Sequence, residues 1–167
     1  MSPGMDAPLT LQMDTADATA ALARWLAPRL GAGDVLLLAG PVGAGKTHFA
    51  RALIQARLAA EGLAEDVPSP SFTLVQTYWA GALEIWHVDL YRLGHADEAP
   101  ELGLDEAFDT ALCLIEWPER LGALAPDGAL WLQFADGRHD AARQITLSAS
   151  APRWAGLLAQ LRADFGG

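Results

Sequence analysis

The segment GPVGAGKT, from Gly40 to Thr47, narrows the folds that this sequence of 167 residues can adopt. It matches the pattern G-x-x-x-x-G-K-[ST] at every fixed position. Directly before it, Val35–Ala39 is a continuous apolar run of the kind found in strands that are buried on both faces. After it, over about Thr47–Ala60, apolar side chains recur at helical spacing. A strand, a glycine-rich loop and a helix in this order predict a phosphate-binding loop, or P-loop, in an α/β fold.

The residue types of this loop suit the binding of phosphate. Glycines let successive backbone N–H groups turn inward, and the following helix adds its positive N-terminal end. Lys46, the only lysine among 11 basic residues, is expected to reach the β- and γ-phosphates, and the Thr47 hydroxyl to bind Mg²⁺. His48 stands where many P-loop proteins have a second Ser or Thr, and its ring could contact the α-phosphate or leave that contact to the backbone. The cofactor-binding residues predicted in the loop are Gly40, Val42, Gly43, Ala44, Gly45, Lys46, Thr47 and His48.

Hydrophobic periodicity predicts the remaining elements. Strands are expected over Leu9–Met13, Thr73–Trp79, Leu83–Leu90, Ala111–Ile115, Leu130–Ala135 and Arg143–Leu147, the first as a short edge strand. Helices are expected over Ala16–Leu30 and Trp154–Phe165, with one or two short helices in the acidic stretch Gly94–Asp109. Because strands and helices interleave, the fold class is α/β, a single P-loop NTPase-like domain over residues 1–167 with a mixed β-sheet flanked by helices. Residues 1–8 are expected to be flexible, and the order of the strands stays open.

Charge and composition exclude several classes of function. The net charge is −10 and basic residues are neither in excess nor clustered, which argues against strong direct binding of RNA or DNA. No apolar run approaches the length of a membrane span, so no membrane partner is expected. Cys113 is the only cysteine, which excludes an internal disulfide and a cysteine-based zinc cluster and leaves no disulfide partner. With an N-terminus unlike a signal peptide, these features predict a cytoplasmic protein.

The tryptophans are expected to be mainly structural. Trp25 and Trp154 fit the apolar faces of predicted helices and are expected in the core. Those on predicted strands are expected to be core or half-buried: Trp79, Trp86 and Trp131. Only Trp117 lies beside a candidate site residue, so only Trp117 receives a functional hypothesis.

Two carboxylates end predicted strands. Asp89 closes LEIWHVD, where it shares a strand face with His87, and Glu116 closes ALCLIE. Ligands of open α/β folds bind at the carboxyl edge of the sheet, where both carboxylates would lie. A P-loop needs acidic groups at that edge for Mg²⁺ and for the attacking group. Asp89 and Glu116 are therefore candidates for metal binding and catalysis, and which of them is the main acid of the metal site stays open.

Three further strings accompany the P-loop: SPSFTLV (Ser69–Val75), HVDLYRL (His87–Leu93) and IEWPERL (Ile115–Leu121). Together the four strings resemble the motifs of the TsaE family, also called YjeE, which is the small ATPase of bacterial tRNA threonylcarbamoyladenosine (t6A) biosynthesis. The resemblance covers Gly40 to about Leu121 with correct order and spacing. One departure is Ser71, where the family usually has Thr.

The resemblance implies roles for individual residues. Lys46 and Thr47 would hold the phosphates and Mg²⁺, and Thr73 would lie on a switch-like loop close to the γ-phosphate or the metal. Asp89 would belong to the metal site through bound water. Glu116 would orient or activate the hydrolytic water, and Trp117 would sit on a second switch segment that contacts the nucleotide. Tyr91 and Arg92 belong to a matched motif whose role stays open.

The resemblance also implies ATP hydrolysis that supports a TsaD–TsaB pair, which transfers threonylcarbamoyl to adenosine 37 of tRNAs. Contact with tRNA would come only through that complex, in agreement with the acidic charge. The choice of ATP over GTP rests on the family alone. Hydrolysis by the isolated chain is expected to be slow because no arginine finger is obvious, although Arg92 and Arg120 stay open for that role. Two alternatives remain, a small-molecule P-loop kinase and a nucleotide-binding switch without significant turnover.

Overall fold

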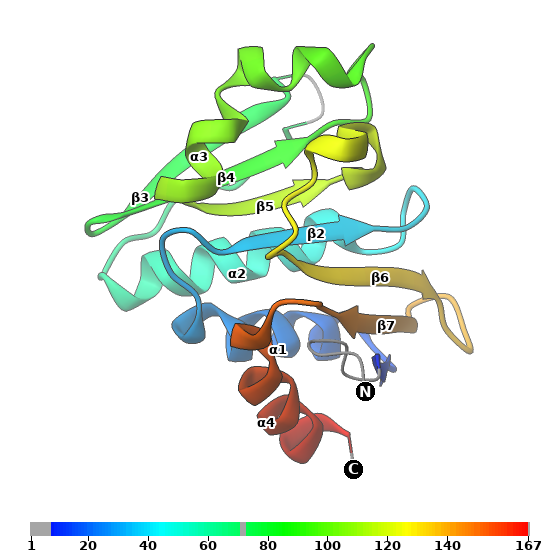
Figure 1. Ribbon diagram of the computed structural model, residues 1–167. Coiled ribbons are helices and arrows are strands. Elements are labelled where there is room, and N and C mark those ends of the chain that lie inside the picture. The colour runs from blue at the N-terminus through cyan, green and yellow to red at the C-terminus, as the bar shows by residue number, and fades with distance from the viewer. Residues whose placement is uncertain (1–7, 71–72, 167) are drawn as a thin grey trace.

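The computed structural model describes residues 8–70 and 73–166, and within them the chain forms one mixed seven-stranded sheet (Figure 1). The strands are β1 (Leu9–Met13), β2 (Val35–Ala39), β3 (Val75–Ala80), β4 (Leu83–Asp89), β5 (Leu112–Glu116), β6 (Leu130–Asp136) and β7 (Arg143–Ser148). Their order across the sheet is β1-β7-β6-β2-β5-β4-β3. The α-helices are α1 (Ala16–Leu26), α2 (Lys46–Ala60), α3 (Leu104–Thr110) and α4 (Ala155–Phe165). The predicted α/β class with a mixed sheet is confirmed, and β1 lies at a sheet edge as predicted.

The centre of the sheet is parallel and its margins are antiparallel. Strand β2 pairs in parallel with β5 on one side and β6 on the other, and β5 pairs in parallel with β4. The outer strands β3, β7 and β1 are antiparallel to their neighbours. The carboxyl ends of β2, β5 and β4 therefore meet at one edge of the sheet. The P-loop begins at this edge, and the carboxylates of Asp89 and Glu116 lie there at the ends of β4 and β5.

Both faces of the sheet are covered by helices, as the apolar run of β2 predicts. Leu36 and Leu38 enter a core cluster with residues of α1, α2 and α4, whereas Val35 and Leu37 enter a second cluster with α3. Side chains alternate across a strand, so a strand between two covered faces must be apolar at every position. The seven-stranded sheet thus separates two cores, with α1 and α2 on one face and α3 on the other (Figure 1).

The structure corrects the end of the first helix. The pattern predicted Ala16–Leu30, but α1 ends at Leu26 and a 3₁₀ turn, η1 (Ala27–Arg29), follows. Pro28 lies in this turn and has no N–H to continue the α-helical ladder, which accounts for the earlier end. At the other end Thr15 caps the helix, and its side chain accepts a hydrogen bond from the Ala18 N–H.

The structure also corrects the burial of two tryptophans. Trp79 was expected in the core or half-buried, yet it is 58% exposed because β3 is an edge strand and alternate residues of β3 face solvent. Trp25 is only partly buried, and its ring N–H donates to Asp164 at 2.8 Å. Trp154 is fully buried as expected. Ser71 and nearly all of the residues expected to be flexible (1–8) lie outside the described part of the chain.

The remaining expectations can be compared directly. Cys113 is buried on β5, as its apolar surroundings predicted. Short 3₁₀ segments, η2 (Ala96–Glu98) and η3 (Pro100–Leu102), precede α3 in the acidic stretch, and η4 (Pro118–Leu124) and η5 (Pro152–Trp154) complete the described elements. No helix in residues 8–70 or 73–166 has the length and apolar character needed to cross a membrane.

Candidate functional site

The P-loop leaves β2 at Gly40 and enters α2 at Gly45, and both glycines are required by the local geometry. A Cβ atom at Gly40 would lie 2.6 Å from the carbonyl oxygen of Phe134 on β6. Gly45 is the residue that caps α2. Its φ of +99° is a backbone conformation that residues with a side chain rarely adopt. Between them Val42 is 75% exposed at the tip of the loop. The loop therefore presents its backbone to the cavity at the N-terminus of a 15-residue helix.

The Lys46 side chain is buried at the centre of the loop. Its ammonium donates to the Gly40 carbonyl at 2.5 Å and lies 3.6 Å from the centre of the Trp117 ring. Burial lowers the pKa of Lys46, while the carboxylates of Glu116, Glu119 and Asp89 oppose this shift. The Lys46 ammonium is thus fixed at the end of β2, where the loop begins.

Glu116 is the acidic group in direct contact with the P-loop. The Thr47 hydroxyl donates to its carboxylate, 2.8 Å from one oxygen and 3.0 Å from the other. On the other side the His87 ring nitrogen Nε2 lies 2.7 Å from the same carboxylate. Because an ionised carboxylate only accepts hydrogen bonds, Nε2 carries the proton. Glu116 is therefore held between a P-loop hydroxyl and a buried imidazole.

His87 is a site residue whose contact the sequence did not reveal. It is fully buried, and its second ring nitrogen, Nδ1, has no hydrogen-bond partner in the described part of the structure. The alternation of HVD in β4 did predict that His87 and Asp89 share a face. The bond from His87 to Glu116 crosses from β4 to β5, so it depends on a strand pairing that local sequence does not define.

Asp89 lies beside Glu116 at the same level of the sheet. The two residues are paired in register between β4 and β5, and Asp89 is 6% exposed. Its carboxylate accepts the Tyr91 N–H at 2.9 Å, and its own N–H donates to the Leu74 carbonyl at 2.9 Å. Leu74 has a positive φ of 66°, an uncommon conformation for leucine. Both predicted carboxylates therefore reach the same edge of the sheet as the P-loop.

Thr73 is one of three predicted site residues, with Gly40 and Ala44, that do not line the cavity. It is exposed, and its hydroxyl accepts a long hydrogen bond of 3.4 Å from Gln76. Thr73 is absent from the cavity lining, although its neighbour Leu74 is bonded to Asp89.

Trp117 closes one side of the site. It adopts a left-handed conformation (φ 59°, ψ 50°) at the start of η4, and its ring lies 4.9 Å from that of Tyr91. Tyr91 is half exposed and lines the cavity together with Arg92. Arg120, the other arginine considered at the sequence level, lies outside the cavity lining and donates to the Leu93 carbonyl at 3.5 Å.

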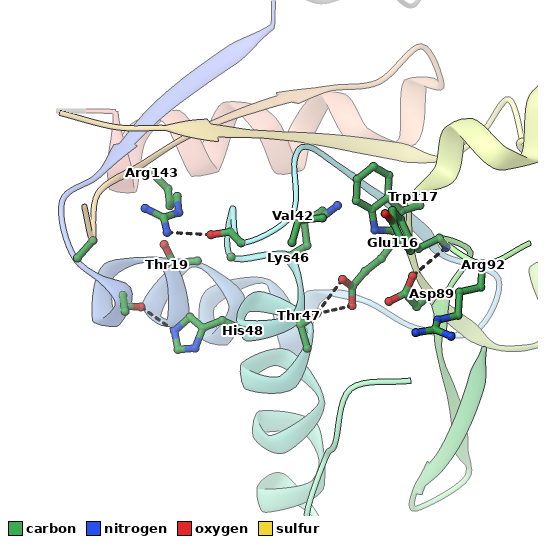
Figure 2. Close-up of a pocket in the computed structure, with 15 residues that line it drawn as sticks. Thr19, Val42, Lys46, Thr47, His48, Asp89, Arg92, Glu116, Trp117 and Arg143 are labelled. Atoms are coloured by element: carbon green, nitrogen blue, oxygen red, sulfur yellow. Dashed lines mark hydrogen bonds between the residues drawn. The ribbon is translucent and has the colours of Figure 1, made fainter. Parts of the chain in front are cut away.

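These side chains line one cavity of about 660 Å³ (Figure 2). Asp89, Arg92, Glu116 and Trp117 lie on one side of the P-loop, and Thr19, His48 and Arg143 lie on the other. Arg143, at the start of β7, donates from its guanidinium to the Gly43 carbonyl at 2.9 Å. No sequence motif marked Arg143, because its contact with the P-loop joins residues that are 100 positions apart.

With this geometry in hand, the comparisons with known proteins identify the family. The family model described as "Threonylcarbamoyl adenosine biosynthesis protein TsaE" matches residues 13–145. The chain belongs to the TsaE family. The predicted resemblance is thereby confirmed, and the family name links the chain to t6A biosynthesis.

Curated TsaE proteins and one solved structure agree with this assignment. The chain is 35% identical to the Bacillus subtilis TsaE protein over 144 residues, which is 86% of this chain and 87% of the relative. It is 43% identical to the Rickettsia conorii TsaE protein over 107 residues, 64% of this chain. The chain spans only 59% of that relative's length and 62% of the Rickettsia felis protein. The crystal structure of Bacillus subtilis YdiB superposes with a TM-score of 0.78 at 30% identity, covering 96% of this chain and 97% of that one.

TsaE proteins are P-loop NTPase-like, so we asked whether the oxygen atoms of the side chains at this site fit Mg²⁺. No cluster of three or more His, Cys, Asp or Glu that could cage a metal ion occurs among the described residues. Magnesium bound with nucleotide needs no such cage, because phosphates and waters supply most of its ligands. The Thr47 hydroxyl on the Glu116 carboxylate, with Asp89 beside them, is the oxygen donor set that this mode of binding requires. The residues present therefore fit Mg²⁺ and a nucleotide phosphate.

Proposed function

We propose that this TsaE-family chain binds Mg·ATP and hydrolyses it to support a TsaD–TsaB complex that forms N6-threonylcarbamoyladenosine at position 37 of tRNAs. The observation that carries the proposal is the 2.8 Å hydrogen bond from Thr47 to Glu116 at the N-terminus of α2. It joins the P-loop hydroxyl expected at Mg²⁺ to the carboxylate at the end of the neighbouring strand. Buried Lys46 stands beside this pair.

The P-loop and Lys46 hold the triphosphate. The loop amides and the N-terminal end of α2 attract negative oxygens, and the Lys46 ammonium neutralises charge on the β- and γ-phosphates. Thr47 and Glu116 would hold Mg²⁺, which would supply positive charge beside the phosphates in the transition state. Asp89 contributes to the same site through water.

Hydrolysis requires a water in line with the bond that breaks, between the γ-phosphorus and the oxygen that bridges to the β-phosphate. Each carboxylate offers about four lone-pair positions. Glu116 can therefore accept from Thr47 and His87 and still orient a water, with Asp89 at the same level on the next strand. Trp117 and Tyr91 line this side of the cavity, with their rings 4.9 Å apart.

Turnover by the isolated chain is expected to be slow. Arg92 and Arg143 line the cavity, and the Arg143 guanidinium is already bonded to the carbonyls of Gly43, Asp140 and Ala142. An arginine finger raises the rate of hydrolysis in P-loop enzymes by a factor of about 10³–10⁵. We propose that docking of the partner pair completes the site. The net charge of −10 supports contact with tRNA only through that complex, which acts in the cytoplasm.

The test is phosphate release from Mg·ATP while the TsaB–TsaD pair is titrated into this chain. The expected result is a saturable rise in rate that is absent for Lys46→Ala, with the variant shown to be folded by circular dichroism. Fast turnover by the chain alone would refute the expectation of partner gating. A flat response from a chain that binds ATP would contradict the proposal, and phosphate on an added acceptor would then indicate a kinase.

A further inference from the structure

We propose that the groove between α3 and η4 is a docking surface for the partner pair, and that it receives an apolar side chain from a basic segment of that pair. The inference rests on the proposed function, because it takes the TsaD–TsaB pair as the partner. It assigns a role to a second cavity and to the acidic stretch Gly94–Asp109, neither of which belongs to the lining of the nucleotide site.

The groove is a separate cavity of about 240 Å³ on the face of the sheet opposite α1 and α2 (Figure 1). Its apolar lining includes residues of α3, of η4 and of the segment after η4: Leu104, Phe108, Leu121, Leu124 and Pro126. Sites for small molecules usually have volumes of roughly 300–1,000 Å³. A smaller cavity with an apolar lining suits one or two side chains of a protein better than a metabolite.

The lining of this groove is open to solvent at Leu124. The Leu124 side chain is 44% exposed, and Phe108 on the opposite wall is only partly buried. Leu121 is fully buried, so η4 is held against the core beside the exposed leucine. Apolar side chains that are gathered around an open groove mark an interaction site more often than single exposed leucines do.

The rim of the groove is acidic. Asp105 and Asp109 line it, and four further carboxylates of the same stretch are exposed: Asp97, Glu98, Glu101 and Glu106. The sequence has no Lys or Arg between Arg92 and Arg120. In the part of the chain that the structure describes, none of these six carboxylates forms a salt bridge with Lys or Arg. A partner that carries Lys or Arg beside its apolar side chain would be complementary to this rim.

The sign of the charge selects the class of partner. RNA and anionic membrane surfaces are negatively charged, so the acidic rim would repel both. A second copy of this chain carries a net charge of −10 and would be repelled in the same way. A basic protein segment is therefore the occupant that the groove favours.

The segment η4 connects the groove to the nucleotide site. It begins directly after Trp117, whose ring lies 3.6 Å from the Lys46 ammonium, and Glu116 precedes Trp117 in the chain. A partner that is seated against Leu124 would thus contact the segment that continues from Glu116 and Trp117. This continuity favours the pair that we propose to complete the nucleotide site as the occupant of the groove.

The experiment measures the affinity of the full chain for the TsaB–TsaD pair by biolayer interferometry in the presence of Mg·ATP. Leu124→Asp places a charge at the mouth of the groove, Leu124→Met keeps an apolar side chain, and Asp109→Lys reverses one charge of the rim. Leu63→Asp and Asp66→Lys are the matched controls, because both residues are exposed and neither lines the groove. Circular dichroism checks that each variant is folded.

Leu124→Asp is expected to weaken binding of the pair by at least about tenfold, and Leu124→Met by less than about twofold. Asp109→Lys is expected to weaken binding by about fivefold at low salt and by less at high salt, because salt screens the lost attraction. The two controls should bind the pair like the wild type. The affinity of the groove variants for Mg·ATP alone should be unchanged, because Leu124 and Asp109 do not line the nucleotide cavity.

Unchanged binding of the pair in Leu124→Asp, or in Asp109→Lys at low salt, would overturn the inference, as would equal losses in the matched controls. If the pair still raised phosphate release in these proteins, the proposed function would stand. Wild-type dimers that dissociate in Leu124→Asp, detected by sedimentation velocity, would place a second copy in the groove and overturn the inference. A wild-type chain that does not bind the pair would overturn both the inference and the proposed function.

Discussion

Glu116 accepts hydrogen bonds from two sides, from the Thr47 hydroxyl at 2.8 Å and from the His87 ring at 2.7 Å. The first contact lies at the site expected for Mg²⁺, and the second lies in the core, where His87 is fully buried. A buried hydrogen-bond donor restricts the orientations of a carboxylate before a metal binds. Fewer orientations are then lost when the carboxylate binds the metal. We therefore expect His87 to act as a positioning residue for Glu116.

Replacing His87 tests this role at the level of one hydrogen bond. His87→Ala is expected to raise the Mg²⁺ concentration needed for half-maximal ATP binding by about 10- to 100-fold, because Glu116 loses its fixed orientation. His87→Gln keeps an N–H donor at a similar distance and should restore most of this affinity. Binding is measured by fluorescence of a labelled nucleotide, and binding of nucleotide in EDTA serves as the control. A normal Mg²⁺ requirement in a folded His87→Ala protein would show that the contact has no role in positioning.

Cys113 supplies a prediction about pH at the same scale. Its thiol is fully buried and donates to the Ala107 carbonyl at 3.5 Å, and burial raises its pKa to about 12. An unfolded cysteine ionises near pH 8.5, so the folded state loses stability relative to the unfolded state as the pH rises above that value. Between pH 7.5 and 9.5 the wild type should lose about 1 kcal/mol more unfolding free energy than Cys113→Ala. Parallel losses in urea unfolding would contradict the predicted ionisation.

Sequence predicted some site residues far better than others. Lys46 and Thr47 follow from a local motif, since the loop and the first turn of α2 are contiguous in the chain. Asp89 and Glu116 could be placed at strand ends, and their shared edge then follows from parallel strands. The contacts of His87 and Arg143 could not be predicted, because each depends on elements that are distant in sequence.

At the scale of elements, the junction of β2 and the P-loop is set by the neighbouring strand β6. A side chain at Gly40 would meet the Phe134 carbonyl at 2.6 Å, so the loop can leave the sheet here only with a glycine. The Gly40 carbonyl also accepts the Lys46 ammonium, which links the end of β2 to the start of α2. Packing between strands therefore constrains the shape of the P-loop where it leaves β2.

Gly40→Ala tests this control. The added methyl group must displace β6 or the loop, so we expect a loss of about 2 kcal/mol of stability and at least a tenfold loss of ATP affinity. Gly31→Ala is the matched control, since no atom lies within 4 Å of a Cβ there, and its stability should change by less than about 0.5 kcal/mol. Chemical denaturation and nucleotide titration measure both effects. An unchanged ATP affinity in Gly40→Ala would refute the proposed role of the junction.

Element types were predictable because the apolar patterns of this chain are regular, but element boundaries were less so. The helix that the pattern extended to Leu30 ends at Leu26, since Pro28 changes the hydrogen bonding. Trp79 could not be placed from β3 alone, because its exposure follows from the position of β3 at the edge of the sheet. Such features depend on the neighbours of an element more than on its own residues.

At the scale of the whole molecule, strand order brings the site together. β5 lies between β2 and β4, so Glu116 is placed next to the P-loop and Asp89 one strand further. The β6–β7 hairpin on the other side of β2 carries Arg143 to the same loop. This order was open at the sequence level, because it is fixed by pairings between distant segments. Strands on both sides of β2 thus contribute residues to one cavity beside the P-loop.

The proposed function requires that ATP hydrolysis in this cavity sustains repeated action of the TsaD–TsaB pair. The most direct measurement is the number of t6A nucleosides formed per TsaD–TsaB complex on tRNA, with saturating Mg·ATP and either the wild-type chain or Lys46→Ala. The wild type is expected to raise this number well above one per complex, whereas folded Lys46→Ala is expected not to. Equal numbers of t6A nucleosides with the two proteins would refute the proposed function, because turnover of the pair would then not require the P-loop.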